Sequence, residues 1–118
     1  MYVRQRELLQ HAQEELAHAQ LLSDRIIQLG ETPPLKPEDW PKFSNCKYLV
    51  PTDAYVKSIL RQNIKSEQCA IDVYNNIMKF VSDKDMVTYH IAEQILQDEL
   101  EHEEDLENIL RDINLIGK

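Results

Sequence analysis

The chain has 118 residues, which suffices for one domain with a single core. Its 42% apolar and 29% charged residues are typical of a folded protein, and two glycines are too few for the turns of a β-rich fold. The formal net charge of −8 argues against a nucleic-acid-binding surface, which needs clustered lysine and arginine. It is compatible with attraction of cations, although a solvated helical surface is the simpler explanation.

Neither a membrane span nor a secretory leader is predicted. The sequence has no stretch of about 18 apolar residues, and it does not open with a signal peptide. Cys46 and Cys69 form neither a CxxC motif nor a disulfide-dense framework. We therefore expect a cytoplasmic protein without a membrane partner.

The first predicted helix covers residues 3–29 and ends before Gly30, a residue type favoured just after a helix. Its apolar positions alternate in steps of three and four, as in a helix of a bundle. The middle of this apolar stripe is polar and carries a Glu-x-x-His motif, Glu15 and His18. Residues three apart share a helix face, so this carboxylate and this imidazole are neighbours.

A connection without clear periodicity follows at residues 31–52. Prolines rule out a long helix here, and a connection of this length is unusual unless the chain crosses from one end of a bundle to the other. We expect this crossover to run along the bundle. Its apolar residues are predicted to pin it to the bundle side: Trp40, Phe43, Tyr48, Leu49 and Val50.

The second predicted helix covers residues 53–81, with Thr52 or Asp53 as its N-cap. The middle of its apolar stripe holds one carboxylate, Glu67. Ser82 or Asp83 is the expected N-cap of the third helix. The turn between these two helices is short, so they should be antiparallel neighbours.

The third predicted helix covers residues 84–113. Its apolar stripe is interrupted by a second Glu-x-x-His motif, Glu99 and His102. Burying a carboxylate and an imidazole without partners is costly, and coordination of a metal compensates for it. If the first and third helices pack on the second, the five polar residues converge at one depth of the bundle: Glu15, His18, Glu67, Glu99 and His102.

One Glu-x-x-His motif in an acidic helix is most often a solvated surface pair. Two copies, each centred on an apolar stripe with a further glutamate at matching depth, are hard to obtain by chance. Carboxylates with one imidazole per metal suit iron or manganese better than zinc. Two such pairs joined by lone glutamates form the pattern of di-iron carboxylate bundles. The five residues are therefore predicted to bind metal and to be catalytic.

Other polar residues near the motifs are interpreted differently. His11 is predicted to be a core-edge or entry residue and not a ligand. Tyr74 is expected to be a buried tyrosine that donates a hydrogen bond, with a ligand carboxylate as one candidate acceptor. Five acids are expected to project away from the site, as solvated surface or as a lining that attracts iron: Glu14, Glu101, Glu103, Glu104 and Asp105.

These motifs resemble those of the ferritin-like superfamily, and most of all those of bacterioferritin and the Dps-like ferritins. The stretch EELAHAQLLSDRIIQLG is similar to the family's second helix and the start of its long crossover. SEQCAIDVY resembles the third helix, and ILQDELEHEEDLENIL resembles the fourth. The resemblance spans nearly the whole chain. It implies an all-α, antiparallel four-helix-bundle fold of which this chain contains three helices.

The resemblance also implies the roles of the ligands. Glu15 and His18 would bind one iron, Glu99 and His102 would belong to the other half-site, and Glu67 would be bridging or terminal. The family's first helix, which contributes one more glutamate, has no counterpart here. We therefore expect an N-terminally truncated single domain; supply of that helix by another chain is the alternative.

Two further features qualify the resemblance. Leu16 stands where bacterioferritin has its haem-ligating methionine, so no haem is expected. The paired CxxC motifs of the rubrerythrin iron–sulfur domain are absent from the sequence.

Some Dps-like ferritins, called thioferritins, carry a cysteine pair near the metal site. Cys46 and Cys69 could be such a redox pair. Cys69 does not share the helix face of Glu67, however, so two unrelated buried cysteines are the alternative.

The function implied by the resemblance is that of a di-iron ferroxidase. It would oxidise Fe(II) with hydrogen peroxide or oxygen at two irons per site, store the iron and protect against oxidative stress. The assembly would be a hollow homo-oligomer of twelve or twenty-four subunits. The alternatives are a rubrerythrin-type peroxidase that stores no mineral and a metal-free helical interaction module. DNA protection is not expected, because Arg4 and Arg6 are too few for a basic tail.

Overall fold

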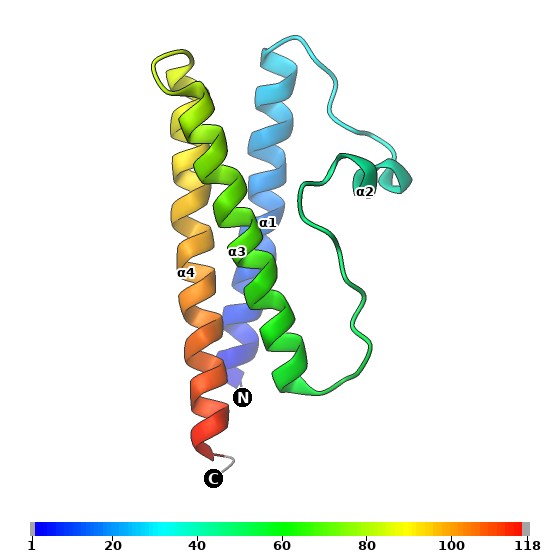
Figure 1. The fold of residues 1–118 in the computed structure, drawn as a ribbon, viewed down its shortest axis with the longest axis vertical. Coiled ribbons are helices and arrows are strands. Elements are labelled where there is room, and N and C mark those ends of the chain that lie inside the picture. The colour runs from blue at the N-terminus through cyan, green and yellow to red at the C-terminus, as the bar shows by residue number, and fades with distance from the viewer. Residues whose placement is uncertain (1, 117–118) are drawn as a thin grey trace.

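The computed structural model describes residues 2–116, and side-chain exposure from residue 5 onward (Figure 1). Within this range the chain is all-helical, as predicted, with three long helices and an extended crossover. The helical elements in chain order are α1 (Tyr2–Gln28), η1 (Pro37–Asp39), α2 (Trp40–Phe43), α3 (Val56–Val81) and α4 (Met86–Ile116). None of these helices is long and apolar enough to cross a membrane.

The end of α1 is set by Gly30, as predicted. Gly30 adopts a φ of 91°, in the left-handed region that glycine enters without a Cβ penalty. Its amide donates to Ile27 at 3.0 Å, and the amide of Glu31 donates to Ile26 at 3.1 Å. This pair of hydrogen bonds is the Schellman motif, which satisfies carbonyls at the end of a helix.

The N-caps of the other two long helices were predicted wrongly. Asp53 accepts a hydrogen bond from the amide of Tyr55 at 2.8 Å, so it forms a turn before α3, and the helix begins three residues later than expected. Asp83 makes the turn between α3 and α4 with a φ of 63°. Asp85 caps α4, since its Oδ1 accepts from the amide of Thr88 at 3.1 Å.

The apolar core lies between α3 and α4, which form an antiparallel hairpin. Its buried members are Leu60, Ile64, Ala92, Ile95, Leu106 and Ile109. α1 packs against α4, antiparallel to it (Figure 1). α4 is therefore the central helix, whereas the sequence analysis had placed the second helix, α3, between the other two. Within residues 5–28 of α1, the buried side chains are His11 and His18.

Arg25 joins the C-terminal end of α1 to the start of α4. Its guanidinium donates to both carboxylate oxygens of Asp85 at 2.9 Å and to the hydroxyl of Thr88 at 2.9 Å. Hydrogen bonds from the hydroxyl and the amide of Thr88, together with the Arg25 guanidinium, lower the pKa of Asp85 to about 2. One carboxylate thus serves both as a helix cap and as an interhelical ion pair.

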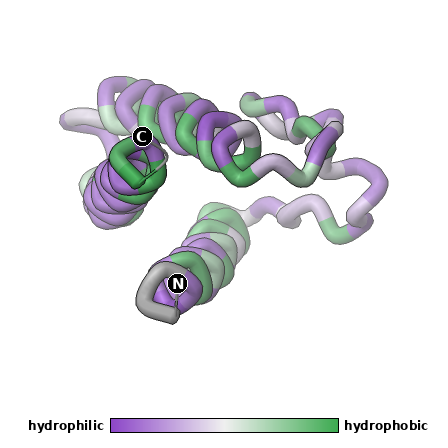
Figure 2. The backbone as a smooth tube through the Cα atoms, turned by 90° about the horizontal axis from the view of Figure 1, so that it is seen from below, coloured by the Kyte–Doolittle hydropathy of each residue, from purple (hydrophilic) through white to green (hydrophobic). Residues whose placement is uncertain are grey.

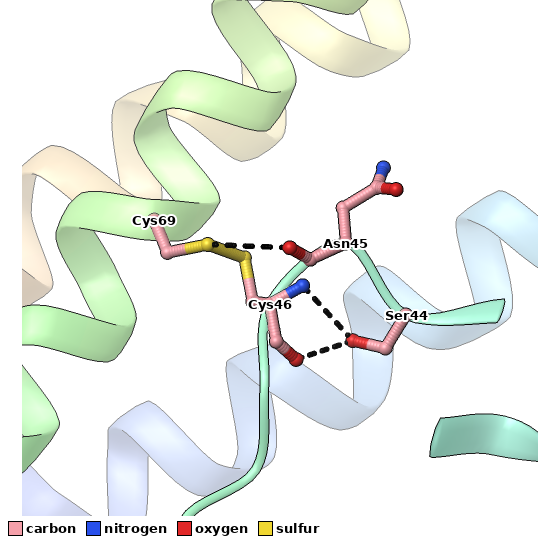
Figure 3. Close-up of a disulfide and its surroundings, with 4 residues drawn as sticks. All are labelled: Ser44, Asn45, Cys46 and Cys69. Atoms are coloured by element: carbon pink, nitrogen blue, oxygen red, sulfur yellow. Dashed lines mark hydrogen bonds between the residues drawn. A yellow bond between two sulfur atoms is a disulfide. The ribbon is translucent and has the colours of Figure 1, made fainter. Parts of the chain in front are cut away.

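The crossover does not pack on the bundle in the predicted way. It lies to the side of the helices, away from α4 (Figure 2). The apolar residues expected to pin it are each more than half exposed: Trp40, Phe43, Tyr48, Leu49 and Val50. Two other links fasten it to α3. Cys46 forms a disulfide with Cys69 (Figure 3), and the side-chain amide of Gln62 donates to the carbonyl of Leu49.

Candidate metal centre

The structure brings all five predicted ligands together at mid-height of the bundle. Glu15, Glu67, Glu99 and His102 each offer one ligand atom, and these four atoms lie within 4.8 Å of one another. They come from all three long helices. His18 joins them, because its Nδ1 lies 3.2 Å from Oε1 of Glu99.

The five residues are not equivalent in their arrangement. Nδ1 of His102 lies 3.2 Å from Glu15, 3.6 Å from Glu99 and 3.7 Å from Glu67. Nδ1 of His18 lies 3.2 Å from Glu99 and 3.5 Å from Glu15. Two carboxylates, those of Glu15 and Glu99, therefore lie between the imidazoles. Glu67 is on the side of His102.

The interior of this cluster contains polar atoms without partners. Glu99 is 2% exposed and His102 is 1% exposed, so water does not solvate them. Four buried atoms have no hydrogen-bond partner within the described part of the chain: Nδ1 of His18, Oε2 of Glu67, Oε1 of Glu99 and Nδ1 of His102. Buried polar groups are nearly always satisfied, so this group of atoms needs an explanation. Carboxylate oxygens and imidazole nitrogens are suitable ligands for iron or manganese, and a cation between them would satisfy them together.

The electrostatics of the cluster agree with a cation site. Burial, together with the neighbouring carboxylates of Glu15 and Glu67, raises the pKa of Glu99 to about 10. Burial acts to lower the pKa of His102, but its carboxylate partners Glu15, Glu67 and Glu14 outweigh this effect and raise the pKa to about 11. Burial also acts to raise the pKa of Glu15, which its contacts with His102, Glu99 and His18 lower to about 2. The concentrated negative charge thus binds protons strongly, and it would attract a metal cation in the same way.

Three interactions around the cluster were missed or misjudged. Nε2 of His102 lies 2.7 Å from Oε2 of Glu14, and Nε2 of His18 lies 2.7 Å from Oδ2 of Asp98. Nε2 of His11 lies 2.8 Å from Oδ2 of Asp105. The prediction that Glu14 and Asp105 project away from the site is therefore wrong.

The sequence does contain a signal for two of these partners. The glutamate of each Glu-x-x-His motif is preceded by an acid, Glu14 in the first and Asp98 in the second. No such signal marks Asp105, which is one of many acids on α4. The exposed acids Glu101 and Glu104 face solvent, as expected.

Tyr74 of α3 lies beside the centre. Burial and the charges of Glu99, Glu15 and Glu67 raise its pKa to about 12, so the phenol stays protonated at neutral pH. Its hydroxyl is thereby available as a donor. A hydrogen bond from it to a ligand carboxylate stays a prediction.

The two cysteines form a disulfide, so they are not two unrelated cysteines, and a redox role for the pair stays a prediction. The Cys46–Cys69 disulfide ties the crossover to α3, two residues after Glu67 (Figure 3). The carbonyl oxygen of Asn45 lies 3.9 Å from Sγ of Cys69, and the Ser44 hydroxyl donates to the carbonyl of Cys46. The disulfide therefore lies at the same level of α3 as the metal-ligand candidate.

Comparisons with known proteins agree with this architecture. The ferritin-like domain family matches residues 5–116. A DNA protection during starvation protein from Pyrococcus furiosus is 32% identical over 108 residues, which are 89% of this chain. The chain spans 58% of the length of that relative. The solved structure of a dodecameric thioferritin, the bacterioferritin-related protein from Bacteroides fragilis, superposes with a TM-score of 0.92 at 46% identity. That match covers 96% of this chain and 67% of the other.

Proposed function

Because the chain belongs to the ferritin-like family, we propose that it supplies a di-iron ferroxidase centre for iron storage and protection from oxidative stress. The ligands are the five residues that the three long helices bring together: Glu15, His18, Glu67, Glu99 and His102. The substrates are Fe(II) and either hydrogen peroxide or oxygen.

One observation carries this proposal. Four buried carboxylate and imidazole atoms, contributed by all three long helices, have no hydrogen-bond partner in the described chain, and they belong to residues of one cluster. A metal-free interaction module would have no reason to retain such a costly arrangement in its interior. The donor set of oxygens with one imidazole at each end suits iron.

The distances suggest how the ligands are shared. Glu15 and Glu99 are within 3.6 Å of both imidazoles, so these two carboxylates would be available to both metal ions. Glu67 would be a terminal ligand on the side of His102. The position beside His18 then has two carboxylates from the described chain, and the position beside His102 has three.

When bound, two Fe(II) ions would supply two electrons, so that one hydrogen peroxide would be reduced to two waters with uptake of two protons, leaving two Fe(III). The protein side chains hold the ions close together and exclude water from the buried face of the site. Glu99 and His102 also hold protons in the absence of metal, and they must release these protons to act as ligands.

The relatives support a proposal for the oligomeric state. The Bacteroides fragilis neighbour is described as dodecameric, and we propose that this chain also assembles as a homo-oligomeric cage of twelve copies. The exposed apolar residues of the crossover would then lie in subunit contacts. The DNA protection in the name of the Pyrococcus relative is not extended to this chain, because a net charge of −8 disfavours contact with the phosphates of DNA.

The test is an anaerobic Fe(II) titration followed by addition of peroxide, with Fe(III) measured by absorbance. We expect about two Fe(II) per chain to be oxidised, and we expect Glu99→Ala and His102→Ala to abolish this. The matched controls are His90→Ala and Glu93→Ala, because these residues form an exposed pair with the same spacing on the same helix, 3.8 Å apart. If the wild type oxidises no more Fe(II) than the Glu99→Ala and His102→Ala variants do, the proposal is contradicted.

A second measurement separates storage from simple peroxide reduction. The protein is loaded with many equivalents of Fe(II) and then sized by sedimentation. A mineral-filled particle much denser than the apoprotein supports iron storage. If peroxide is consumed but the density does not change, the rubrerythrin-type alternative is correct instead.

A further inference from the structure

We propose that a groove between the first half of α3 and the last turns of α4 binds a phosphate group, as the free ion or as the head of a small organic phosphate. The groove does not include the metal-ligand candidates, and the proposal does not depend on the metal centre. It gives a role to positive charges that the proposed iron chemistry does not use.

Side chains from both helices of the hairpin line the groove, which encloses about 650 Å³. Cavities that bind small molecules have volumes of this order. Six of the lining side chains are polar or charged: Arg61, Lys65, Gln68, Glu107, Arg111 and Asn114. Three of these are cationic and one is a carboxylate, so the lining is positive in a chain whose net charge is −8.

This positive charge is out of keeping with the helices that form the groove. α4 is rich in acids, and Arg111 is its only lysine or arginine between residues 86 and 116. On α3, Arg61 and Lys65 are one turn apart, and no acid precedes Glu67 in that helix. The basic residues of two different helices are therefore gathered at one place.

The three cationic groups lack an anionic partner. Within residues 5–116, neither Arg61 nor Lys65 nor Arg111 forms an ion pair, whereas Arg25 and Lys42 do so elsewhere in the chain. Like charges one turn apart on a helix repel each other. An anion close to both Arg61 and Lys65 would relieve this repulsion, and Arg111 would contact it from the opposite helix.

The donor groups suit a phosphate. A guanidinium presents a planar fork of N–H donors that matches two phosphate oxygens, and the lysine ammonium adds a compact charge. The side-chain amides of Gln68 and Asn114 can donate to the remaining oxygens. Because donors come from α3 and from α4, the tetrahedral anion would be held from two sides.

Apolar side chains complete the lining. Ile64 belongs to the buried core cluster, and Leu110 packs against that cluster. Leu115 also lines the groove and is 63% exposed. The groove thus has more room and more apolar surface than a bare phosphate ion would fill. We therefore expect an organic phosphate with a small apolar body to bind more tightly than the free ion.

Calorimetric titration of the full chain tests the proposal with two probes, inorganic phosphate and phenyl phosphate, at neutral pH and constant ionic strength. A chelator is present, so that bound metal cannot take up the phosphate. We expect one probe per chain, with phenyl phosphate the tighter. Arg61→Gln and Arg111→Gln should each weaken binding about tenfold or more, because each removes a hydrogen bond between charged groups. Glu107→Gln should strengthen binding, because it removes a negative charge from the lining.

Lys79→Gln is the matched control, because it removes an exposed cation from α3 outside the groove. It should leave the affinity unchanged. Arg111→Lys keeps the charge but loses the planar fork, so its affinity should lie between those of the wild type and Arg111→Gln. Circular dichroism checks that each variant is folded.

The outcomes separate the possible ligands. Tighter binding of phenyl phosphate supports an organic phosphate, and equal affinities support the free ion. Equal weakening by Lys79→Gln and Arg61→Gln would refute the site, because it would show only general attraction of anions. If neither probe binds the wild type, the proposal is wrong. A change of sedimentation coefficient in Arg61→Gln and Arg111→Gln would then assign the groove to a contact between copies of the chain.

Discussion

The imidazole of His11 stacks on the imidazole of His102, with the ring centroids 4.1 Å apart and the planes inclined by 27°. His11 reaches this place from α1, and its Nε2 is fixed by Asp105 of α4. One face of the His102 ring is therefore covered by a second histidine, which is itself held by the same helix as His102.

Replacing His11 by alanine should remove this cover and leave a void beside the centre. We expect His11→Ala to lower the free energy of unfolding by about 1–3 kcal/mol, as for other buried side chains that pack and form hydrogen bonds. Urea unfolding followed by circular dichroism measures this. His90→Ala, at an exposed position of α4, should change the free energy by no more than about 0.5 kcal/mol. An equal effect of both variants would show that the His11 contact is not stabilising.

The uneven distribution of carboxylates predicts the order of metal binding. The position beside His102 is near Glu15, Glu67 and Glu99, so it should bind the first metal ion more tightly than the position beside His18 binds the second. Calorimetric titration with Mn(II) should therefore show two unequal sites. Glu67→Gln should weaken the tighter one by roughly tenfold or more. Asp72→Asn, at an exposed acid of the same helix, should leave both unchanged, and two equal sites in the wild type would refute the assignment.

The raised pKa values predict that metal uptake releases protons. At pH 7 Glu99, with a pKa of about 10, and His102, with a pKa of about 11, both hold a proton in the absence of metal. A metal ion must displace these protons, so the apparent affinity should increase as the pH rises from 6 toward 8. Titrations in two buffers with different ionisation enthalpies count the protons released. Affinity independent of pH over this range would contradict the prediction.

Asp85 predicts a dependence of stability on pH at the acidic end. Its pKa in the folded protein, about 2, lies below the ordinary value of 3.8, so its contribution is fully present above pH 3.8 and is lost as the pH falls toward 2. Asp85→Asn should therefore melt at a lower temperature than the wild type at pH 7, and the difference should shrink toward zero near pH 2. Thermal unfolding between pH 2 and 7 tests this, with Asp83→Asn as a control that should show no such convergence.

The disulfide should control the order of the crossover more than that of the helices. The disulfide closes the loop between residues 46 and 69 and so restricts the unfolded chain. This loss of loop entropy in the unfolded chain stabilises the folded protein by about 3 kcal/mol. Cys46→Ser combined with Cys69→Ser should lower stability by about this amount and speed hydrogen exchange in residues 31–55. A reductant should have the same effect on the wild type and none on the double variant. Unchanged exchange in the crossover would show that Gln62 alone is sufficient to hold it.

The clustering of the five candidate ligands could be predicted from the sequence because they interrupt a pattern. Glu15, His18, Glu67, Glu99 and His102 occupy positions where the helical period demands apolar residues, and α1, α3 and α4 were each recognised with errors of a few residues at their ends. Their supporting acids could not be predicted in the same way. Glu14 and Asp98 act through the α1–α4 contact, and the sequence analysis had assigned the central position to α3.

The other errors have similar physical causes. The turn before α4 contains three residues able to cap a helix, Ser82, Asp83 and Asp85, and local sequence does not decide which one is used. The apolar residues of the crossover were expected to be buried against the helices. Apolar character indicates burial somewhere, but it does not distinguish contacts within the chain from contacts with another copy.

The contrast between the two helix interfaces has a consequence for how the molecule folds. α3 and α4 share an apolar core and a short turn, so this hairpin can form early from local contacts. α1 has only His11 and His18 buried among residues 5–28, and both meet carboxylates of α4. Its docking is therefore governed by charge, and we expect it to come last. The iron that the site is proposed to bind would then also stabilise the folded state, because its ligands come from α1 as well as from α3 and α4. The same bonds that hold the iron for oxidation would hold α1 on the hairpin.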